Sequence, residues 1–468
     1  MAESPALEAH RHPGSYVDPA GAVYEVDGKI LRGIQAPFAD FYASLLSRPP
    51  VEGMLGQQIV ETSVAPDALD GYPLTLEHRR LSPVTFCYEW PPQMLKAAAL
   101  LTLDICLKLT DHGMVLKDAY PWNVVFEGTR PIFVDFTSVM PEDPKLIWVA
   151  YDQFCRFFLY PLALCSWKSG KLSRALLLDH INGVSDSDLV PLLPRSAPLV
   201  MPWLIGRVHL PRLVLGLVRR MGTDKALTDM SARLNPNQKA RRAFFASLRR
   251  NVNAILLPIQ KSRWATYYAD IETFMRPAEF NLKQATVARI LEECRPKTVV
   301  DIGCNRGGYS ILAAQAGAHV TAFDTDEDSI ALLYQLAHGR HLDILPLVMD
   351  FLSPSPACGW RAMQYSAAPQ RLRSDIALAL ALVHHLAITQ RQTFERIVPA
   401  LADYAGQWLL TEFVPLEDPR SREIMVTHQR DMSWYSLDRF IEALRSVFSH
   451  VQTYPSFPEG RVLLLCTR

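Results

Sequence analysis

Two aspartates, each placed at the end of an apolar run, stand where they could hold a nucleotide-like ligand. Residues 298–300 lead into Asp301, and residues 319–323 lead into Asp324, 23 positions further along the chain. A glycine loop lies between them, with Gly303, Gly307 and Gly308 as its members. In an open α/β sheet, ligands bind at the carboxyl ends of the strands. The pattern therefore predicts a β-α-β unit whose ligand contacts both aspartates.

The charges around this loop distinguish between two kinds of ligand. A dinucleotide would bring its pyrophosphate to the glycine loop and the helix N-terminus, where Asp301 would repel it. Asn305 also occupies the place of the middle glycine of a dinucleotide-binding loop. S-adenosylmethionine carries a sulfonium and an ammonium instead of phosphates, and Asp324 is placed to accept hydrogen bonds from both ribose hydroxyls. These residues therefore favour S-adenosylmethionine, with a glycine-rich turn that binds no ligand as the alternative.

Further apolar runs complete an α/β pattern in the C-terminal part. Five more strands are predicted, at residues 344–348, 375–383, 408–414, 451–454 and 462–466, with the last two forming an antiparallel pair. Residues 435–447 have helical spacing. Strands that alternate with helices predict a doubly wound, seven-stranded α/β sheet. Asp350 follows the third strand within two residues, where its carboxylate can accept a hydrogen bond from an adenine amine.

Three ionisable residues follow the central strands of this predicted sheet. His384 and His385 come directly after the fourth strand, and Glu412 lies near the end of the fifth. A neutral imidazole can accept a proton near neutral pH. We therefore expect one of the two histidines to be a catalytic base, with Glu412 as the next candidate. A buried, purely structural histidine pair is the alternative.

With these motifs, residues 285–468 resemble a class I S-adenosylmethionine-dependent methyltransferase. The segments 301–307, 355–360 and 381–386, which read Asp-Ile-Gly-Cys-Asn-Arg-Gly, Ser-Pro-Ala-Cys-Gly-Trp and Ala-Leu-Val-His-His-Leu, are similar to a bacterial group. That group includes methyltransferase-like proteins associated with rhizobial nodulation. The resemblance implies that Asp301 faces the methionine part of the cofactor and that Asp324 holds the ribose. The expected cofactor contacts are Asp301, Gly303, Cys304, Asn305, Gly307, Asp324, Thr325, Asp350 and Phe351.

The N-terminal part carries a second constellation of polar residues. Asp118 and Asn123 are five positions apart, and Asp135 follows a predicted hairpin of strands 124–126 and 132–134. In protein and aminoglycoside kinases, this arrangement supplies a catalytic aspartate and two magnesium ligands. Residues 20–190 therefore resemble the kinase-like fold, which implies an α+β domain with Asp118, Asn123 and Asp135 in one cleft.

Several parts of an active kinase are missing from this region. No glycine-rich phosphate loop is visible, Lys29 is the candidate for the phosphate-contacting lysine, and Thr137 replaces the glycine after Asp135-Phe136. Since phosphoryl transfer depends on positioning and charge stabilisation, we expect weak or absent phosphotransfer. The domain would bind substrate or nucleotide, with ATP and magnesium as the ligand to consider. In the simplest alternative, Asp118 and Asn123 only stabilise a loop through hydrogen bonds to the backbone.

A basic segment separates the two predicted domains. From Arg207 to Arg250 the chain has eleven Lys or Arg residues and two Asp residues, interleaved with apolar positions. Such a segment could bind an anionic substrate, a membrane surface or RNA. A helical connector whose arginines face solvent or pair with acids is the simpler interpretation. We therefore expect a basic helical connector over residues 191–262.

Composition limits the remaining function classes. The 468 residues carry a formal net charge of zero, so nothing indicates a general affinity for polyanions. The eight cysteines contain no Cys-x-x-Cys pair, which argues against a zinc site and a disulfide framework. We expect a cytoplasmic protein, because no signal peptide and no run of 18 uninterrupted apolar residues is visible.

These observations predict a chain of three parts. They are a kinase-like domain at 1–190, the connector at 191–262 and a methyltransferase domain at 263–468, within which Trp264 or Tyr267 is a candidate lid over the cofactor. The predicted function is methyl transfer to an oxygen or nitrogen of a small-molecule or glycan acceptor in biosynthesis. An RNA-directed methyltransferase and a bifunctional kinase-methyltransferase are the alternatives. Homo-oligomerisation is left open.

Overall fold

A computed structural model describes residues 10–15, 18–167, 169–209, 236–260, 262–266, 270–427 and 431–468. The chain forms two compact units. The N-terminal unit comprises Met1–Phe126 with Pro131–Pro258, and the C-terminal unit contains Ile259–Arg468. Each unit has a sheet of its own and is described by itself below.

A five-stranded antiparallel sheet begins the N-terminal unit. Its order is β1-β2-β3-β5-β4, formed by His10–Arg11, Gly21–Val26, Lys29–Ile34, Leu74–His78 and Thr62–Val64. The β2–β3 hairpin turns at Asp27 and Gly28, which both have positive φ, at 48° and 78°. Two consecutive left-handed residues define the tight turn that matches the twist of paired strands. Helix α1 (Ala39–Leu45) follows β3 directly.

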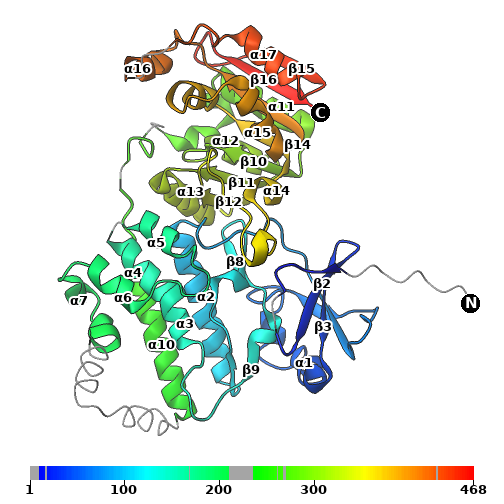
Figure 1. The fold of residues 1–468 in the computed structure, drawn as a ribbon, viewed down its shortest axis with the longest axis vertical. Coiled ribbons are helices and arrows are strands. Elements are labelled where there is room, and N and C mark those ends of the chain that lie inside the picture. Colours follow the sequence, from blue (N-terminus) through cyan, green and yellow to red (C-terminus); the bar gives the residue numbers. More distant parts are fainter. Residues whose placement is uncertain are drawn as a thin grey trace, which may run out of the picture. The chain divides into compact units, whose positions relative to one another are not determined.

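The rest of the N-terminal unit is mainly helical and is organised around α2 (Pro92–Thr110), which runs through the blue-to-cyan part of Figure 1. Two short strand pairs follow it, formed by β6 (Met114–Leu116) with β9 (Val139–Pro141), and by β7 (Val124–Glu127) with β8 (Arg130–Phe133). The later helices are α3 (Tyr151–Phe154), α4 (Tyr160–Ser166), α5 (Gly170–Leu176), α6 (Asp186–Leu192), α7 (Ala197–Val200) and α10 (Gln238–Ala254). A sheet followed by a helical part is the α+β arrangement predicted for this region.

Helix α10 carries most of the described part of the basic segment, and three of its arginines contact acids of the same unit. Arg241 is buried, pairs with Glu142 at 3.4 Å and donates to four backbone carbonyls. Arg242 pairs with Asp111, and Arg249 pairs with Asp104. These pairs are what the connector interpretation predicts for the arginines. Residues 210–235, which supply much of the positive charge, lie outside the described part of the chain.

The C-terminal unit contains the predicted seven-stranded sheet (Figure 1). Its order is β12-β11-β10-β13-β14-β16-β15, and only β16 runs antiparallel to its neighbours. The strands are β10 (Thr298–Ile302), β11 (His319–Asp324), β12 (Ile344–Val348), β13 (Ser374–Ala379), β14 (Ala405–Phe413), β15 (His450–Pro455) and β16 (Val462–Thr467). The first strand of this sheet in sequence, β10, lies at its centre. Strands β11 and β12 follow on one side of β10, and the chain then crosses over to place β13 on the other side. This reversal places a ligand crevice at the carboxyl end of β10.

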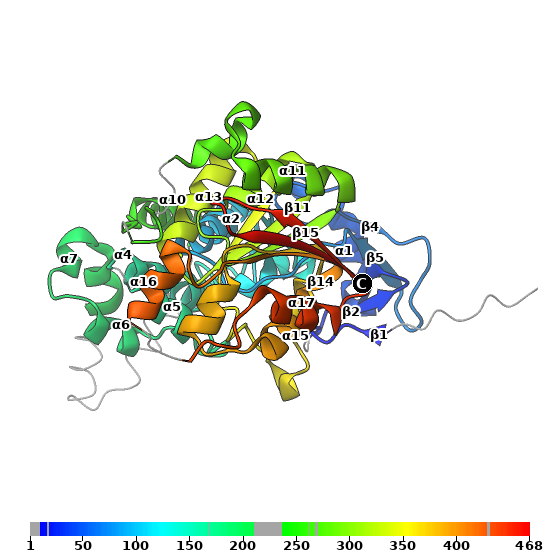
Figure 2. The ribbon, with the colours of Figure 1, turned by 90° about the horizontal axis from the view of Figure 1, so that it is seen from above.

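Helices cover both faces of this sheet, as Figure 2 shows. One face carries α11 (Leu282–Cys294), α12 (Gly308–Gln315) and α13 (Glu327–Arg340). The other carries α15 (Phe394–Tyr404) and α17 (Leu437–Arg445), while α14 (Ala368–Arg371) and α16 (Pro419–Thr427) are short elements in connections. Because both faces are covered, the central strands are largely buried and mainly apolar. The fold class predicted for this part is confirmed.

One predicted strand is shorter in the structure. The apolar run 375–383 forms strand only to Ala379, and a turn follows in which Ala381 has a φ of 51°. His384 and His385 therefore begin a helical turn instead of ending the strand. Periodicity did not reveal this break, because the turn residues are as apolar as the strand. Across the described residues, no helix is both long and apolar enough to cross a bilayer.

Candidate active site

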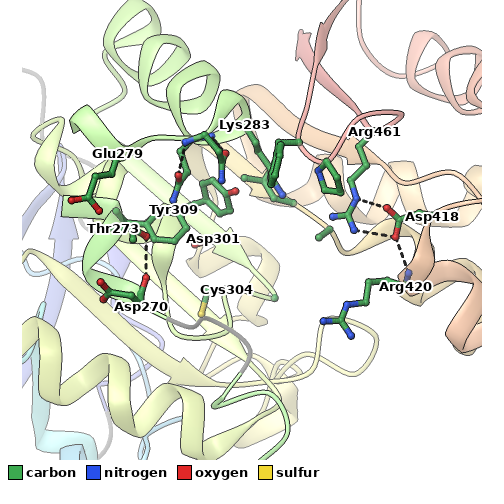
Figure 3. A pocket seen from close by; sticks show the side chains of 18 of the residues that line it. Asp270, Thr273, Glu279, Lys283, Asp301, Cys304, Tyr309, Asp418, Arg420 and Arg461 are labelled. Atoms are coloured by element: carbon green, nitrogen blue, oxygen red, sulfur yellow. Dashed lines mark hydrogen bonds and ion pairs between the residues drawn. The ribbon is translucent and has the colours of Figure 1, made fainter. Parts of the chain in front are cut away.

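A cavity of about 660 Å³ opens at the carboxyl end of β10 in the C-terminal unit. Figure 3 shows its wall. The side chains at its centre come from the glycine loop and the adjoining helices and include Lys283, Asp301, Cys304 and Tyr309. One end is lined by Asp270, Thr273 and Glu279, and the opposite end by Asp418, Arg420 and Arg461. The sequence-predicted residues Asp301, Gly303 and Cys304 therefore lie together in one cavity wall.

Asp301 is the buried acid of this cavity. Its side chain accepts a hydrogen bond from the hydroxyl of Ser310 at 2.6 Å, and only 3% of the residue is exposed. Burial, opposed mainly by the Ser310 hydrogen bond, raises the pKa of Asp301 to about 6. No Lys or Arg of the described residues forms an ion pair with it. At neutral pH the cavity therefore contains a carboxylate whose charge has no direct counter-ion.

The loop after Asp301 needs left-handed backbone at several positions. Asn305, which stands at a usual glycine position, has a φ of 51°, and asparagine tolerates this conformation better than most residues. Gly307 has a φ of 75°, and a Cβ atom there would lie 2.5 Å from the Leu333 side chain. The substitution of glycine by asparagine at 305 thus preserves the loop, whereas a side chain at 307 would not fit.

Asp324, at the end of β11, helps to hold this loop. One of its carboxylate oxygens accepts a hydrogen bond from the Asn305 backbone at 2.8 Å, and the other accepts one from the Asp326 backbone at 2.9 Å. Burial, opposed by these backbone hydrogen bonds, raises its pKa above the ordinary value. Each oxygen has a second lone pair, so Asp324 can still accept hydrogen bonds from a ligand. Its ribose role stays a prediction.

The other three predicted cofactor contacts lie along the same sheet edge. Thr325 follows Asp324 directly, and its hydroxyl lies 3.5 Å from the Asp324 carboxylate. Asp350 is exposed after β12, where it accepts a hydrogen bond from the Leu352 backbone at 2.9 Å. Phe351 is buried against the Tyr404 ring, with 6.1 Å between the ring centroids. The structure thus brings these residues to the expected edge, and their cofactor contacts remain predictions.

A buried ion pair lies beside Asp301 and was not anticipated. The Lys283 ammonium lies 2.6 Å from the Glu412 carboxylate, and both side chains are almost completely buried. Glu412 also accepts hydrogen bonds from the Ala381 backbone at 2.9 Å and from the Ser456 hydroxyl at 2.7 Å. Both oxygens of the proposed base are thus already engaged, which suits a positioning role for Glu412. Its catalytic assignment stays a prediction.

A second buried ion pair forms the far end of the cavity. Arg461 donates to both oxygens of Asp418, over 2.8 and 3.1 Å, in the two-pronged geometry visible in Figure 3. Phe457 and Pro458 line the same end. These residues come from the segment after β14 and from the β15–β16 hairpin, so sequence spacing could not have brought them together.

The two histidines lie near the glycine loop but do not line the cavity. His384 is 2% exposed, and its Nδ1 atom has no hydrogen-bond partner among the described residues. The His385 ring packs edge-on against Trp264, with 5.5 Å between the centroids. Burial lowers the pKa of His385 to about 4, and burial also lowers that of His384. Both imidazoles are therefore neutral at pH 7 and weakly basic.

The predicted lid residue Trp264 lies close to the loop. Its backbone carbonyl accepts a hydrogen bond from the Asn305 side chain at 3.0 Å, while 40% of the residue is exposed. This contact fixes the segment before β10 against the cofactor loop, as a lid would require. Tyr267, the other candidate, lies outside the described residues.

In the N-terminal unit, the structure places two of the three predicted cleft residues close together. The charge of Asp135 contributes, after burial, to raising the pKa of Asp118 to about 6. Asn123 accepts a backbone hydrogen bond from Val134 at 2.8 Å, which holds the loop before β7 next to Asp135. Lys29, the candidate for the lysine position of kinases, pairs instead with Glu77 at 3.4 Å at the surface. Arg32, three residues later on β3, pairs with Asp135 at 3.2 Å instead.

The cavity of the C-terminal unit suits S-adenosylmethionine. Asp301, a carboxylate that forms no direct ion pair among the described residues, would attract its positive charges, whereas it would repel a pyrophosphate. Asp324 can accept hydrogen bonds from a ribose, and the left-handed loop at Asn305 and Gly307 lets the backbone approach a ligand closely. The strand order, with reversal at β10 and an antiparallel β16, is that of a class I methyltransferase. The C-terminal unit is therefore an S-adenosylmethionine-dependent methyltransferase domain.

Comparison with known proteins agrees with this domain. Residues 267–353 match the family model of the tellurite resistance protein TehB. The solved structure of TehB from Haemophilus influenzae is 16% identical, over 42% of this chain and 66% of that chain, with a TM-score of 0.29. A WbdD structure with a kinase inhibitor is 19% identical, over 39% of this chain and 40% of that chain, with a TM-score of 0.29. Both structural likenesses are distant.

One curated relative matches over nearly the whole chain. Nodulation protein NoeA of Rhizobium meliloti (strain 1021) is 30% identical over 472 residues, which span 95% of this chain and 94% of that protein. The match includes both units, so the whole chain is related to NoeA and not the methyltransferase domain alone. The chain belongs to the family of NoeA.

Proposed function

We propose that this protein transfers a methyl group from S-adenosylmethionine to an oxygen or nitrogen of a small molecule, such as a natural product or carbohydrate. The observation that carries the proposal is the cavity at β10, in which Asp301 is buried without a direct counter-ion. A cationic cofactor supplies the missing charge. When bound, S-adenosylmethionine provides a methyl group activated by its sulfonium.

The chain's own residues would bind the cofactor, position the acceptor and exclude water. Asp301 and Asp324 would hold the cofactor at one side of the loop. The pair Asp418–Arg461, together with Phe457, supports a polar acceptor at the other end, because fixed donors and acceptors beside an aromatic ring suit hydroxyl-bearing molecules. Holding two reactants in line is a large part of catalysis for a displacement reaction.

His384 and His385 remain the proposed bases. The support is their position after β13, beside the loop and Trp264. His384→Ala and His385→Ala should be compared for turnover and for cofactor affinity. Loss of a general base lowers the rate by about 10²–10⁴-fold while cofactor binding persists. Full turnover in both variants would leave proximity as the source of catalysis, and joint loss of binding and stability would make the pair structural.

Product mass spectrometry tests the proposed reaction. The full chain is incubated with a metabolite extract and S-adenosylmethionine that carries a deuterated methyl group. We expect labelled small molecules with the wild type and with Glu459→Ala, an exposed control in the same unit. We expect none with Asp324→Ala at a limiting cofactor concentration. Label recovered in RNA, with no labelled small molecule, would contradict the proposal and favour the RNA-directed alternative.

A further inference from the structure

The N-terminal unit contains a cluster of opposite charges where the kinase-like fold would bind magnesium and ATP. The cluster consists of Asp18, Arg32, Lys117, Asp135 and Thr137. Asp18 precedes β2, Arg32 lies on β3, and Lys117 follows β6. The cluster thus joins the sheet to the loop that carries Asp118, and the proposed methyl transfer makes no use of it.

Asp18 lies where an anion would be bound. The Lys117 ammonium donates to one of its oxygens at 3.0 Å, as does the backbone of Ala20 at 2.9 Å. The other oxygen lies 2.9 Å from the Thr137 hydroxyl and 3.8 Å from the Arg32 guanidinium. Although burial raises the pKa of Asp18, these hydrogen bonds lower it below its ordinary value. Asp18 is therefore ionised and gives Lys117 and Arg32 the charge that a phosphate would otherwise supply.

Arg32 lies where a cation would be bound. Its guanidinium is 3.2 Å from Asp135, and it donates to the Thr137 hydroxyl, which also lies 2.9 Å from Asp135. The residue is 8% exposed, so this is a buried contact. In protein kinases, the aspartate at the place of Asp135 binds magnesium. Here a permanently charged guanidinium already compensates that carboxylate, so these residues do not fit a magnesium-nucleotide complex.

We propose that Asp18 is a built-in anion of the N-terminal cleft, which takes the place of a phosphate between Arg32 and Lys117 and keeps Arg32 against Asp135. The cleft of the natural chain then binds no magnesium-ATP, and it becomes an anion site when the charge of Asp18 is removed. This inference concerns the N-terminal unit and is independent of the methyl-transfer proposal.

The test is calorimetric titration of the full-length chain with ATP, with and without magnesium. We expect no saturable binding to the wild type at millimolar ATP. Asp18→Asn keeps the shape of the side chain but frees Lys117 and Arg32, so ATP should bind at least about tenfold more tightly, on the scale of charge-assisted hydrogen bonds. Asp18→Asn combined with Lys117→Met should lose this gain. Asp40→Asn removes an exposed charge from α1 and should behave as the wild type.

Two results would overturn the proposal. One is micromolar, magnesium-dependent binding of ATP to the wild type, a result that can be obtained without any variant. The other is an Asp18→Asn chain that is folded, with the same urea midpoint as the wild type, and yet binds ATP no more tightly. If Asp18→Asn does not fold, Asp18→Ser replaces it, with the same gain expected and the same absence of gain counting against the proposal.

Discussion

In the C-terminal cavity, Asp301 is buried beside a hydroxyl and has no direct counter-ion, whereas in the N-terminal cleft Asp18 and Asp135 both lie beside cations. The lysine nearest to Asp301 is already paired with Glu412. A carboxylate that is desolvated without compensation costs free energy in the free protein, and a cationic ligand can recover it. A cluster in which opposite charges are already paired stabilises the fold, and a charged ligand gains little binding free energy from it. The difference separates a candidate ligand site from a structural one.

The largest expected effect comes from removing the partner of Lys283. Glu412→Ala leaves a buried ammonium without a counter-ion, which should lower the free energy of unfolding by about 3–5 kcal/mol. The released Lys283 should turn toward Asp301 and thereby make the C-terminal cavity resemble the compensated cleft, so S-adenosylmethionine should also bind more weakly. Urea unfolding of the C-terminal unit and calorimetry measure the two effects. The double variant Glu412→Gln with Lys283→Met should recover much of the stability. Unchanged stability in Glu412→Ala would show that this pair contributes nothing.

A smaller effect is expected at the ribose position. Asp324→Ala should weaken cofactor binding by about 1.5–3 kcal/mol, the scale of hydrogen bonds to a charged acceptor. Glu459→Ala is the matched control, because this exposed acid lies in the same unit. Equal affinity of Asp324→Ala and the control would show that Asp324 does not bind the ribose. The role of the wild-type carboxylate would then be limited to its hydrogen bonds with the loop.

The affinity should also depend on pH through Asp301. Because its pKa is about 6 in the free protein, lowering the pH from 7.5 to 5 protonates the carboxyl and removes the charge that attracts the cofactor. One unit below a pKa, about a tenth of the groups remain ionised, so affinity should fall by about tenfold. Asp301→Asn has no such charge at any pH, and its weaker binding should vary little over this range. A wild-type affinity that is the same at both pH values would contradict this assignment.

The smallest effect is expected at Lys29, which the sequence suggested for the N-terminal cleft. Its ammonium and the Glu77 carboxylate form a partly exposed pair, so Lys29→Ala should change stability by no more than about 1 kcal/mol. Arg32→Ala should destabilise the N-terminal unit more, because Asp135 and Asp18 then lose a buried partner. Comparable urea midpoints for Lys29→Ala and Arg32→Ala would mean that the cluster around Arg32 stabilises the N-terminal unit no more than the surface pair of Lys29 and Glu77 does.

Local patterns predicted the sheet and the loop, but not the ion pairs. Strands that end in Asp301 and Asp324, and the glycine loop between them, depend on neighbours in sequence, so periodicity and the positions of the glycines were sufficient. Lys283 and Glu412 are 129 positions apart, and Arg32 is 105 positions from Thr137. Such pairs exist only because elements that are far apart in the sequence meet in the fold, and a single sequence carries no signal for them.

The end of β13 shows the same limit on a shorter scale. The run from 375 to 383 is apolar throughout, yet the strand ends at Ala379, because the backbone turns where Ala381 bonds to Glu412. This turn decides which way His384 and His385 face. The catalytic prediction therefore depended on a tertiary contact that the apolar pattern could not reveal.

The most direct test of the account is a calorimetric titration of the wild-type chain with S-adenosylmethionine at pH 7.5. The uncompensated charge of Asp301 predicts one saturable site of micromolar strength. Asp301→Asn, measured in the same way, should bind measurably more weakly, because the buried charge at the carboxyl end of β10 is then missing. Absence of saturable binding in the wild type, or equal affinity in both chains, would contradict the claim that this carboxylate marks the cofactor site.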